Sequence, residues 1–522
     1  MKRILFTTLI LFVALATYCL ASIDPQGKLI FSLGGEVSVL NPILSTDSSS
    51  SAVEGVVFSG MVRVNENLEV IPDMADRWTV SKDGKIWTFY LKKNIKWHDG
   101  KPFTADDVVF TFNSILNPKV NSVRRGDYII DGSPIRFSAP DKYTVRAYLS
   151  KPFAPFLLHA GMGIIPKHLF KGQDVNTCEY NRKPVGTGPF IFSQWKSGDS
   201  LTVMRNPNYY LGSPKLAAII YRVIPDANAR LIALQKGEVD VSDIPPKDYG
   251  NLKNNINLNL FDFESLDYTY LGFNLVNPLF SDIRVRQALA YATDKNKLVK
   301  IIFKGFASPA FVPSAPISWA HNPDGEKYSY NLEKAKKLMS QAGWVSGSDG
   351  IQKKNGITFE FTILLNQGNK EREKAAIILQ QQWKKVGVKA NIRVMEWSAL
   401  LQIIESQKLP RKFDALIIGW SLGVDPDSYT IWHSSQYPKG FNMIHYNNPD
   451  VDSLLVEGRT TIDKKKRAKI YKEIDKIIAH DQPYLFLWYP KAIVGVNKRV
   501  GGLSKPGPAG LFINIHNVFV RR

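Results

Sequence analysis

Strand–helix–strand order along the chain predicts a mixed α/β fold, and two segments carry this prediction. In the first, an apolar strand over 218–224 is followed by Pro225-Asp226, which supplies a turn and a helix N-cap. A helix over 227–236 follows, and an apolar strand resumes over 239–241. The composition, 44% hydrophobic and 22% charged over 522 residues, is that of an ordinary globular protein.

The second segment begins with an alternating, β-branched strand over 357–365 and a loop over 366–369. Its helix carries apolar residues three or four positions apart, ends at Gly387 and leads into a strand over 388–394. Sheets of parallel strands are buried on both faces, and ligands collect beyond the carboxyl ends of the strands. The loop over 366–369 is therefore a predicted part of a binding site.

The same rule applies to the loop after Phe413–Ile418, a continuous apolar stretch that predicts a fully buried strand. This loop reads GWSLGVDPDSYTIWHSSQ from Gly419, and a solvated turn has no need of its two tryptophans. Its Asp-Pro-Asp lacks the further oxygen ligands and the bidentate Glu of a calcium loop, so we interpret it as a turn. Trp420 and the residues after it are thus predicted to lie at a binding edge.

The N-terminus has the parts of an export signal. Met1-Lys2-Arg3 supplies the positive end, Ile4–Leu20 is apolar and uncharged, and small residues suited to cleavage follow. We therefore predict that residues 1–21 are a cleavable signal peptide. An uncleaved membrane anchor and a lipoprotein linked through Cys19 are the alternatives, although the bulky tyrosine before that cysteine argues against the lipoprotein.

The formal charge of +20 does not predict a nucleic-acid partner, because the basic residues are scattered and the N-terminal signal predicts export. The densest run, Lys464-Lys465-Lys466-Arg467, opens a helix whose other face is apolar, and we interpret the run as a solvated helix face. Once the signal is removed, Cys178 stands alone, so no intrachain disulfide is available. We expect this cysteine to be a small buried hydrophobe.

The chain carries no motif of an enzyme or of a metal site. Its eight histidines show no HExxH spacing, and it has no CxxC, nucleophile elbow, Walker loop or GxGxxG. Gly186-Thr187-Gly188-Pro189 is glycine-rich, but the proline removes an amide that a phosphate cradle would need, which favours a turn. We expect no catalytic residue, no metal and no cofactor. A secreted hydrolase with dispersed carboxylates remains the alternative from a different functional class.

Five stretches, in order along the mature chain, resemble one family closely: the extracytoplasmic solute-binding proteins, family 5, of peptide-type ABC transporters, which include the dipeptide- and oligopeptide-binding proteins. The most specific stretch is ADRWTVSKDGKIWTFYLKKNIKWHDGKPFTADDVVFTFNSILNP, from Ala75 to Pro118. The others are KPVGTGPFIFSQWKSGDSLTVMRNPNYY from Lys183, DIRVRQALAYATDKNKLV from Asp282, NLEKAKKLMSQAGW from Asn331 and HYNNPDVDSLL from His445.

The resemblance implies a two-lobed, type II-like periplasmic-binding-protein (Venus-flytrap) fold, with an extra domain inserted in the first lobe. The limits it implies are 22–60, 186–272 and 483–522 for lobe 1, 61–185 for the inserted domain and 273–482 for lobe 2. It also implies binding without chemistry: the lobes close over a ligand, and the closed form docks on a permease of an ABC importer in the inner membrane.

We accordingly expect a monomeric periplasmic protein that captures oligopeptides or dipeptides. The same role for another small solute, such as an oligosaccharide, a nickel complex or an opine, is the alternative within this class. The ligand-binding residues we expect are, in the loop after the buried strand, Trp420, Leu422, Gly423, Asp425 and Asp427, and at other strand ends Trp397, Asn369, Gly35 and Thr46.

One departure from the family concerns the anchor for a peptide's α-ammonium. In the dipeptide- and oligopeptide-binding relatives, an aspartate three residues before the Asp-Pro pair holds this group, and that position is Leu422 here. Burying an ammonium without a carboxylate costs several kcal/mol. Three explanations stay open: Asp425 or Asp427 is re-aimed, a carboxylate or other contacts elsewhere hold the peptide, or the ligand has no free amine.

Overall fold

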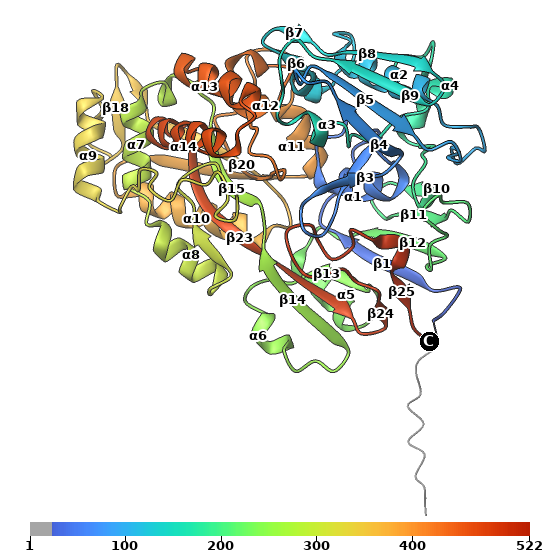
Figure 1. The fold of residues 1–522 in the computed structure, drawn as a ribbon. Coiled ribbons are helices and arrows are strands. Elements are labelled where there is room, and N and C mark those ends of the chain that lie inside the picture. The colour runs from blue at the N-terminus through green and yellow to red at the C-terminus, as the bar shows by residue number, and fades with distance from the viewer. Residues whose placement is uncertain (1–22) are drawn as a thin grey trace, which may run out of the picture.

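A 14-residue strand, β23 (Tyr484–Asn497), runs through both lobes and links their sheets into one path (Figure 1). This computed structural model describes residues 23–522, so the predicted signal peptide at 1–21, with Cys19, lies outside the described residues. The 12-stranded sheet has the order β10-β11-β12-β1-β13-β23-β15-β22-β20-β21, and β14 and β16 also pair with β23. The mixed α/β architecture predicted from the sequence is confirmed.

Lobe 1 is built on the first half of this path. Its strands are β1 (Lys28–Leu33), β10 (Phe190–Lys196), β11 (Ser200–Arg205), β12 (Ala218–Val223), β13 (Val241–Asp243) and β14 (Leu258–Glu264), with helices α1 (Ser48–Val57), α5 (Ala227–Gln235) and α6 (Tyr249–Leu252). β1 lies parallel to both β12 and β13. Asp226 caps α5 by accepting from the amides of Asn228 and Ala229, as its place after a predicted turn indicates. The first predicted strand–helix–strand segment is confirmed.

The inserted domain carries its own four-stranded antiparallel sheet, in the order β4-β5-β9-β8. Its strands are β2 (Val62–Val64), β3 (Val70–Pro72), β4 (Ala75–Val80), β5 (Ile86–Leu91), β6 (Ile129–Ile130), β7 (Ser133–Pro134), β8 (Arg136–Asp141) and β9 (Thr144–Tyr148), and its helices are α2 (Ala105–Leu116), α3 (Phe156–His159) and α4 (Lys167–Phe170). Thr104 and Asp107 form a capping box at the start of α2. The free Cys178 is buried here, as predicted.

Lobe 2 occupies the other end of the path. Its strands are β15 (Asp267–Phe273), β16 (Ala307–Pro309), β17 (Val345–Ser346), β18 (Gln352–Lys354), β19 (Ile357–Thr358), β20 (Glu360–Asn366), β21 (Lys389–Met395) and β22 (Ala415–Ser421). Its helices are α7 (Ile283–Tyr291), α8 (Lys295–Phe303), α9 (Leu332–Gln341), α10 (Lys370–Lys384), α11 (Trp397–Ile404), α12 (Tyr429–Trp432), α13 (Pro449–Thr460) and α14 (Lys464–Asp481). β20 is parallel to β21 and β22, which confirms the second predicted segment.

Successive residues of β22 enter two different cores, because neighbouring side chains of a strand point to opposite faces. Ala415 and Ile417 belong to one buried cluster, and Leu416 and Ile418 belong to the other. The strand predicted from the apolar run is therefore covered on both faces, and its chain emerges at Trp420.

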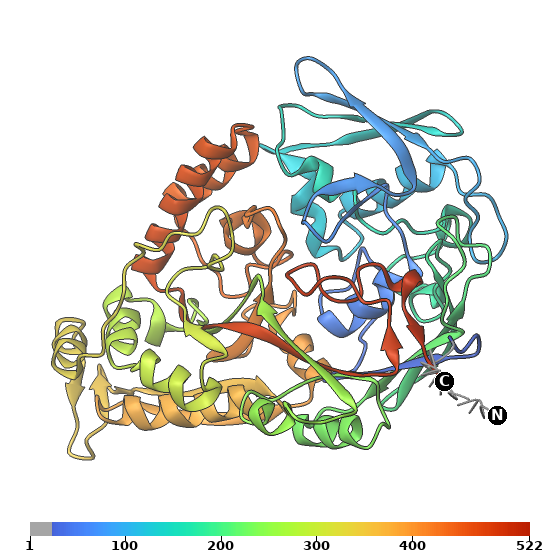
Figure 2. The same cartoon turned by 60° about the horizontal axis from the view of Figure 1, so that its bottom comes forward.

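The chain crosses between the lobes at two places (Figure 2). β14 pairs with the later half of β23, and Glu264 opposite Lys491 is the last pair of this ladder. β15 pairs with the earlier half of β23 and with β22. The limits implied by the resemblance, 272/273 and 482/483, fall at the end of β15 and just before β23. The last strands, β24 (Val500–Gly501) and β25 (Phe519–Val520), pair with each other beside lobe 1. No helix within residues 23–522 is long and apolar enough to cross a bilayer.

Candidate functional site

The two lobes touch along the edges of a shared cleft, so the structure has a closed arrangement. A Cβ built on Gly35, just after β1, would lie 3.3 Å from Cδ1 of Trp397 in lobe 2. A Cβ built on Gly368, in the loop after β20, would lie 2.1 Å from the carbonyl oxygen of Pro225 in lobe 1. Glycine at these two positions therefore permits the close approach of the lobes.

The predicted residues at strand ends fall along this contact. Thr46 faces Glu405 of lobe 2, and its hydroxyl hydrogen-bonds the Glu405 carboxyl. Both side chains line a cavity of about 430 Å³ between the lobes. Burial raises the pKa of Glu405 to about 7, although the Thr46 hydroxyl lowers it. Asn369 has a local role, since its side chain accepts from the amide of Arg372 and caps α10.

The strand predicted to end at Ile418 continues to Ser421, so Trp420 lies on β22 and pairs with Tyr268. Trp420 and the predicted residues of the loop after it lie in three different settings. Trp420 and Leu422 are half-buried against the second core of lobe 2, and the Trp420 ring meets Phe441 edge-on at 5.2 Å between centroids. The Nε1 of Trp420 is buried and has no acceptor at hydrogen-bond distance among the described residues. Gly423 is exposed.

Asp425 is held by α14. Its two carboxylate oxygens accept from Nη1 and Nη2 of Arg467, each at 2.7 Å, a bidentate pair. The prediction of a solvated helix face is confirmed for Lys464–Lys466, which are exposed, but is wrong for Arg467. Arg467 is buried, because its guanidinium turns inward to Asp425 and to the carbonyl of Gly458.

Asp427 joins lobe 2 to the inserted domain. It accepts from Nε of Arg459 at 3.0 Å and lies 3.7 Å from Nε2 of His159. Burial raises the pKa of Asp427, but Arg459 and His159 outweigh burial and lower it to about 2. Arg459 also donates to the carbonyl of Ile129. Asp425 and Asp427 are thus both paired with arginines, and in this structure neither is free to hold an ammonium.

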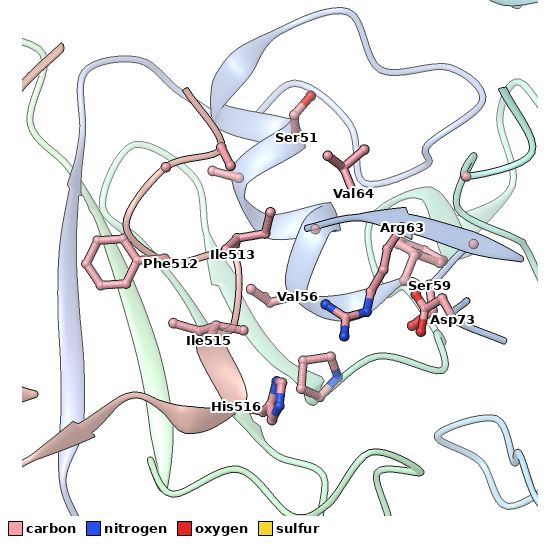
Figure 3. Close-up of a pocket in the computed structure, with 18 of the residues that line it drawn as sticks. Ser51, Val56, Ser59, Arg63, Val64, Asp73, Phe512, Ile513, Ile515 and His516 are labelled. Atoms are coloured by element: carbon pink, nitrogen blue, oxygen red, sulfur yellow. The ribbon is translucent and has the colours of Figure 1, made fainter. Parts of the chain in front are cut away.

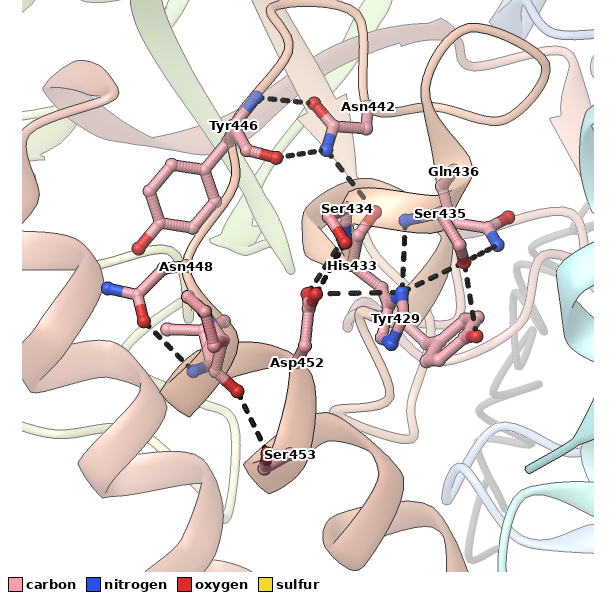
Figure 4. A network of polar contacts seen from close by, with 12 residues as sticks. Tyr429, His433, Ser434, Ser435, Gln436, Asn442, Tyr446, Asn448, Asp452 and Ser453 are labelled. Carbon is pink, nitrogen blue, oxygen red and sulfur yellow. Dashed lines mark hydrogen bonds and ion pairs between the residues drawn. The ribbon is translucent and has the colours of Figure 1, made fainter. Parts of the chain in front are cut away.

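A polar network fixes the chain that follows this loop (Figure 4). Asp452 of α13 accepts from the amide and the hydroxyl of Ser434, and Asn442 donates to the carbonyls of His433 and Tyr446. The network holds Gln436 against the inserted domain, where a Cβ on Gly126 would lie 2.4 Å from Oε1 of Gln436. This is a further point at which lobe 2 meets the first lobe.

Two carboxylates beside the cleft, Asp243 and Asp267, are not among the residues predicted from the sequence. Asp243 ends β13 in lobe 1, and Asp267 begins β15 and pairs in register with Ser421 of β22. Burial raises the pKa of both carboxyls, and the charge of Asp243 raises that of Asp267 further. The Asp243 side chain is nevertheless exposed, and the charge of Arg230 lowers its pKa. Neither carboxylate has an ion-pair partner within 4.0 Å among residues 23–522, so a cation between them would be attracted to both.

Two arginines complete the charged lining. Arg372 of α10 donates from Nη1 to Oδ1 of Asn366 at 2.8 Å, and burial lowers its pKa to about 10. Arg230 of α5 donates from Nη1 to the carbonyls of Ile224 and Pro225, and it lies against Gly34. In both guanidiniums Nε is buried without an acceptor among the described residues. They retain donors for an anion.

The arrangement has the chemistry of a binding site. It brings acidic and basic side chains of both lobes to one cleft, which suits a ligand that carries both charges. Within residues 23–522, no group of three or more His, Cys, Asp or Glu comes together in a form that could hold a metal ion.

Comparisons with known proteins agree with this geometry. The sequence profile of the bacterial extracellular solute-binding proteins, family 5, matches residues 69–441. The oligopeptide-binding protein AppA of Bacillus subtilis is 37% identical over 91% of this chain and 88% of its own length. The dipeptide-binding protein of Escherichia coli is 30% identical over 91% of each chain.

This chain belongs to family 5 of the extracellular solute-binding proteins. It is the substrate-binding protein of an ABC transporter, acts outside the cytoplasm and is not an enzyme. The resemblance stated from the sequence and the two-lobed fold are both confirmed.

Two solved structures show how far the likeness extends. AppA of Bacillus subtilis in complex with a nonapeptide has a TM-score of 0.91 and 35% identity, covering 96% of this chain and 100% of that one. NikZ of Campylobacter jejuni in complex with Ni(L-His) has a TM-score of 0.86 and 31% identity, covering 95% and 100%. The fold is therefore shared by proteins whose cargoes differ.

Proposed function

We propose that this protein captures peptides between its lobes in the periplasm and delivers them, as a monomer, to the permease of an ABC importer. The observation that carries the proposal is a pair of neighbouring carboxylates, Asp243 and Asp267, which have no ion-pair partner within 4.0 Å among residues 23–522, together with two guanidiniums that keep free donors. A peptide with free ends offers an ammonium to the first pair and a carboxylate to the second.

We assign the peptide's α-ammonium to Asp267. This corresponds to the explanation that a carboxylate elsewhere in the chain holds the peptide in place of the anchor missing at Leu422. Asp267 lies directly opposite Ser421 in the β15–β22 pair, and Ser421 precedes Leu422. A carboxylate from the neighbouring strand thus comes near the position at which the loop itself lacks one. Asp425 and Asp427 then shape the cleft indirectly, since their arginine pairs hold the loop in place.

Arg372 is the proposed partner of the peptide's carboxylate. Its Nη1 donates to Asn366, whereas its Nη2 makes no hydrogen bond among the described residues and can donate to a ligand oxygen. The remaining predicted residues, Trp420, Leu422, Gly423, Trp397, Asn369, Gly35 and Thr46, are proposed as the walls and rim of the cleft. The nonapeptide bound by AppA supports a peptide cargo here.

An amino-acid–metal complex is the second candidate, because NikZ, with Ni(L-His), has a similar structure. The two candidates differ in one charge. A free peptide presents an α-ammonium, whereas an amine bound to a metal has lost that proton.

Isothermal titration with peptides of two to eight residues, each free and N-acetylated, tests the proposal. Acetylation removes the ammonium, and we expect affinity to fall by about 100-fold, the equivalent of about 2.7 kcal/mol. C-terminal amidation should weaken binding through Arg372. Failure of every peptide to bind, or tighter binding of Ni(L-His) than of any peptide, would overturn the proposal.

A further inference from the structure

A second cavity lies wholly outside the cleft between the lobes. It has a volume of about 660 Å³, and it is enclosed by α1, the β2–β3 hairpin, part of β1 and the C-terminal segment around 509–516. None of its lining residues belongs to lobe 2. Small-molecule sites usually span about 300–1,000 Å³, so this cavity is large enough for a ligand of its own.

One side of the cavity is apolar. Figure 3 shows Val56 of α1 facing Ile513 and Ile515 of the C-terminal segment, with Phe512 beyond them. Gly55, the residue of α1 before Val56, has no atom within 4 Å of where its Cβ would be, so the helix leaves open space there. A glycine within a helix costs about 1 kcal/mol relative to alanine, and filling this space would be expected to stabilise the lobe.

The other side is polar and carries Arg63 of β2, whose charge opposes the rise that burial causes in the pKa of the nearby Asp73. In Figure 3 its guanidinium extends from β2 into the space between Val56 and His516. Nη1 donates to Oδ1 of Asn514 at 3.3 Å, but Nε is buried with no acceptor among the described residues. Arg63 makes no ion pair within 4.0 Å in the part of the chain described.

The neighbours of Arg63 limit the charge that the cavity can accept. Asp73 is buried, accepts from the hydroxyl of Tyr210 and adds a nearby negative charge, which disfavours a doubly charged anion. His516 is kept neutral, because burial, Arg63 and Lys215 lower its pKa. Ser59 lines the same end with a hydroxyl.

We propose that this lobe 1 cavity is a second binding site, for a small amphipathic monocarboxylate whose carboxylate meets Arg63 and whose hydrocarbon body fills the apolar side. A planar guanidinium with free donors matches the two oxygens of a carboxylate. Apolar walls with a few placed polar groups are the usual lining of small-molecule sites. The site is separate from the peptide cleft, because none of the residues that line this cavity belongs to lobe 2.

Octanoate titrated into the full protein tests the site. We expect saturable binding of one molecule, and at least tenfold weaker binding of the neutral octanamide. Arg63→Met should weaken octanoate by tenfold or more and leave peptide binding unchanged. Gly55→Leu should weaken octanoate binding by tenfold or more, because its side chain occupies part of the apolar side of the cavity, while keeping or raising the melting temperature.

The matched control is Asp267→Asn, which lies in the cleft and should leave octanoate binding as it is. Three results would each overturn the proposal: no saturable binding at millimolar octanoate, equal affinity of the wild type and Gly55→Leu, or loss of octanoate when peptide saturates the cleft. The last result would place octanoate between the lobes. Gly55→Leu keeps the test decisive even if Arg63→Met fails to fold.

Discussion

Asp267 is the residue on which the proposed recognition of a peptide most depends. Asp267→Asn keeps the size and hydrogen bonding of the side chain but removes the charge. We expect the affinity for a free peptide to fall by tenfold or more, because the ammonium loses its counter-charge. The melting temperature of the ligand-free protein should hold or rise, since a desolvated carboxylate is removed.

Asp262→Asn is the matched control. Asp262 is an exposed carboxylate on the neighbouring β14, where it accepts from the Tyr249 hydroxyl. Titration calorimetry and thermal melts of both variants give the comparison. Equal loss of affinity in the two would mean that the effect is one of net charge and not of the anchor.

Glu405 predicts how binding depends on pH. Its carboxyl is buried where the lobes meet, which raises its pKa to about 7. A raised pKa means that the charged form is disfavoured in the closed state, so closure weakens as pH rises from the ordinary Glu pKa of 4.5 to about 7 and then levels off. Peptide affinity should therefore fall about tenfold or more between about pH 5 and pH 7 in the wild type, whereas Glu405→Gln should remove this part of the dependence. Identical pH profiles would contradict the assignment.

At the scale of elements, the loop after β22 is held by α13 and α14. Arg467→Met leaves the Asp425 carboxylate, 16% exposed, without its bidentate partner. Breaking a buried ion pair costs about 3–5 kcal/mol, and the partial exposure of Asp425 places the expected loss at or below about 3 kcal/mol. Chemical denaturation measures it. Asp425→Asn should restore much of the stability in the double variant, and an unchanged midpoint in Arg467→Met would refute the role of the pair.

The elements that sequence reasoning predicted are those whose signals are local. The spacing of apolar residues and the caps at Asp226 and Asn369 define the two strand–helix–strand segments, and the structure has both. The apolar run before Gly419 likewise forms most of β22, and the side chains on the two faces of this strand are buried in two different hydrophobic clusters.

The charged lining was harder to predict, because it depends on pairing between distant segments. Asp243 ends a strand that is parallel to β1, so the rule about carboxyl ends of strands could have identified it. Asp267 meets Ser421 only through the register of β15 and β22. The partners of Asp425 and Asp427 lie on two later helices, and nothing local in the loop indicates that these carboxylates are paired.

At the scale of the whole molecule, two strand crossings join lobes that meet at their far edges. The crossings allow the lobes to separate with little loss of core, since each lobe has hydrophobic clusters of its own. A ligand that contacts both lobes then binds the closed form better than the open form and shifts the population towards it.

Gly368→Ala tests this closure. Its Cβ would lie 2.1 Å from the Pro225 oxygen across the lobes, so the variant should resist closing. We expect at least a tenfold loss of peptide affinity and no compaction on adding peptide in small-angle X-ray scattering. Gly350→Ala is the control, because Gly350 also has a positive φ but faces open space within lobe 2. Wild-type affinity in Gly368→Ala would show that closure does not need this contact.

Mass spectrometry of the ligand released from purified protein tests the central claim most directly. The account predicts masses that fragment as short peptides with free amino and carboxyl ends, and no such species from the Asp267→Asn variant. A sugar, an opine or a metal–amino-acid complex bound in stoichiometric amount would contradict it.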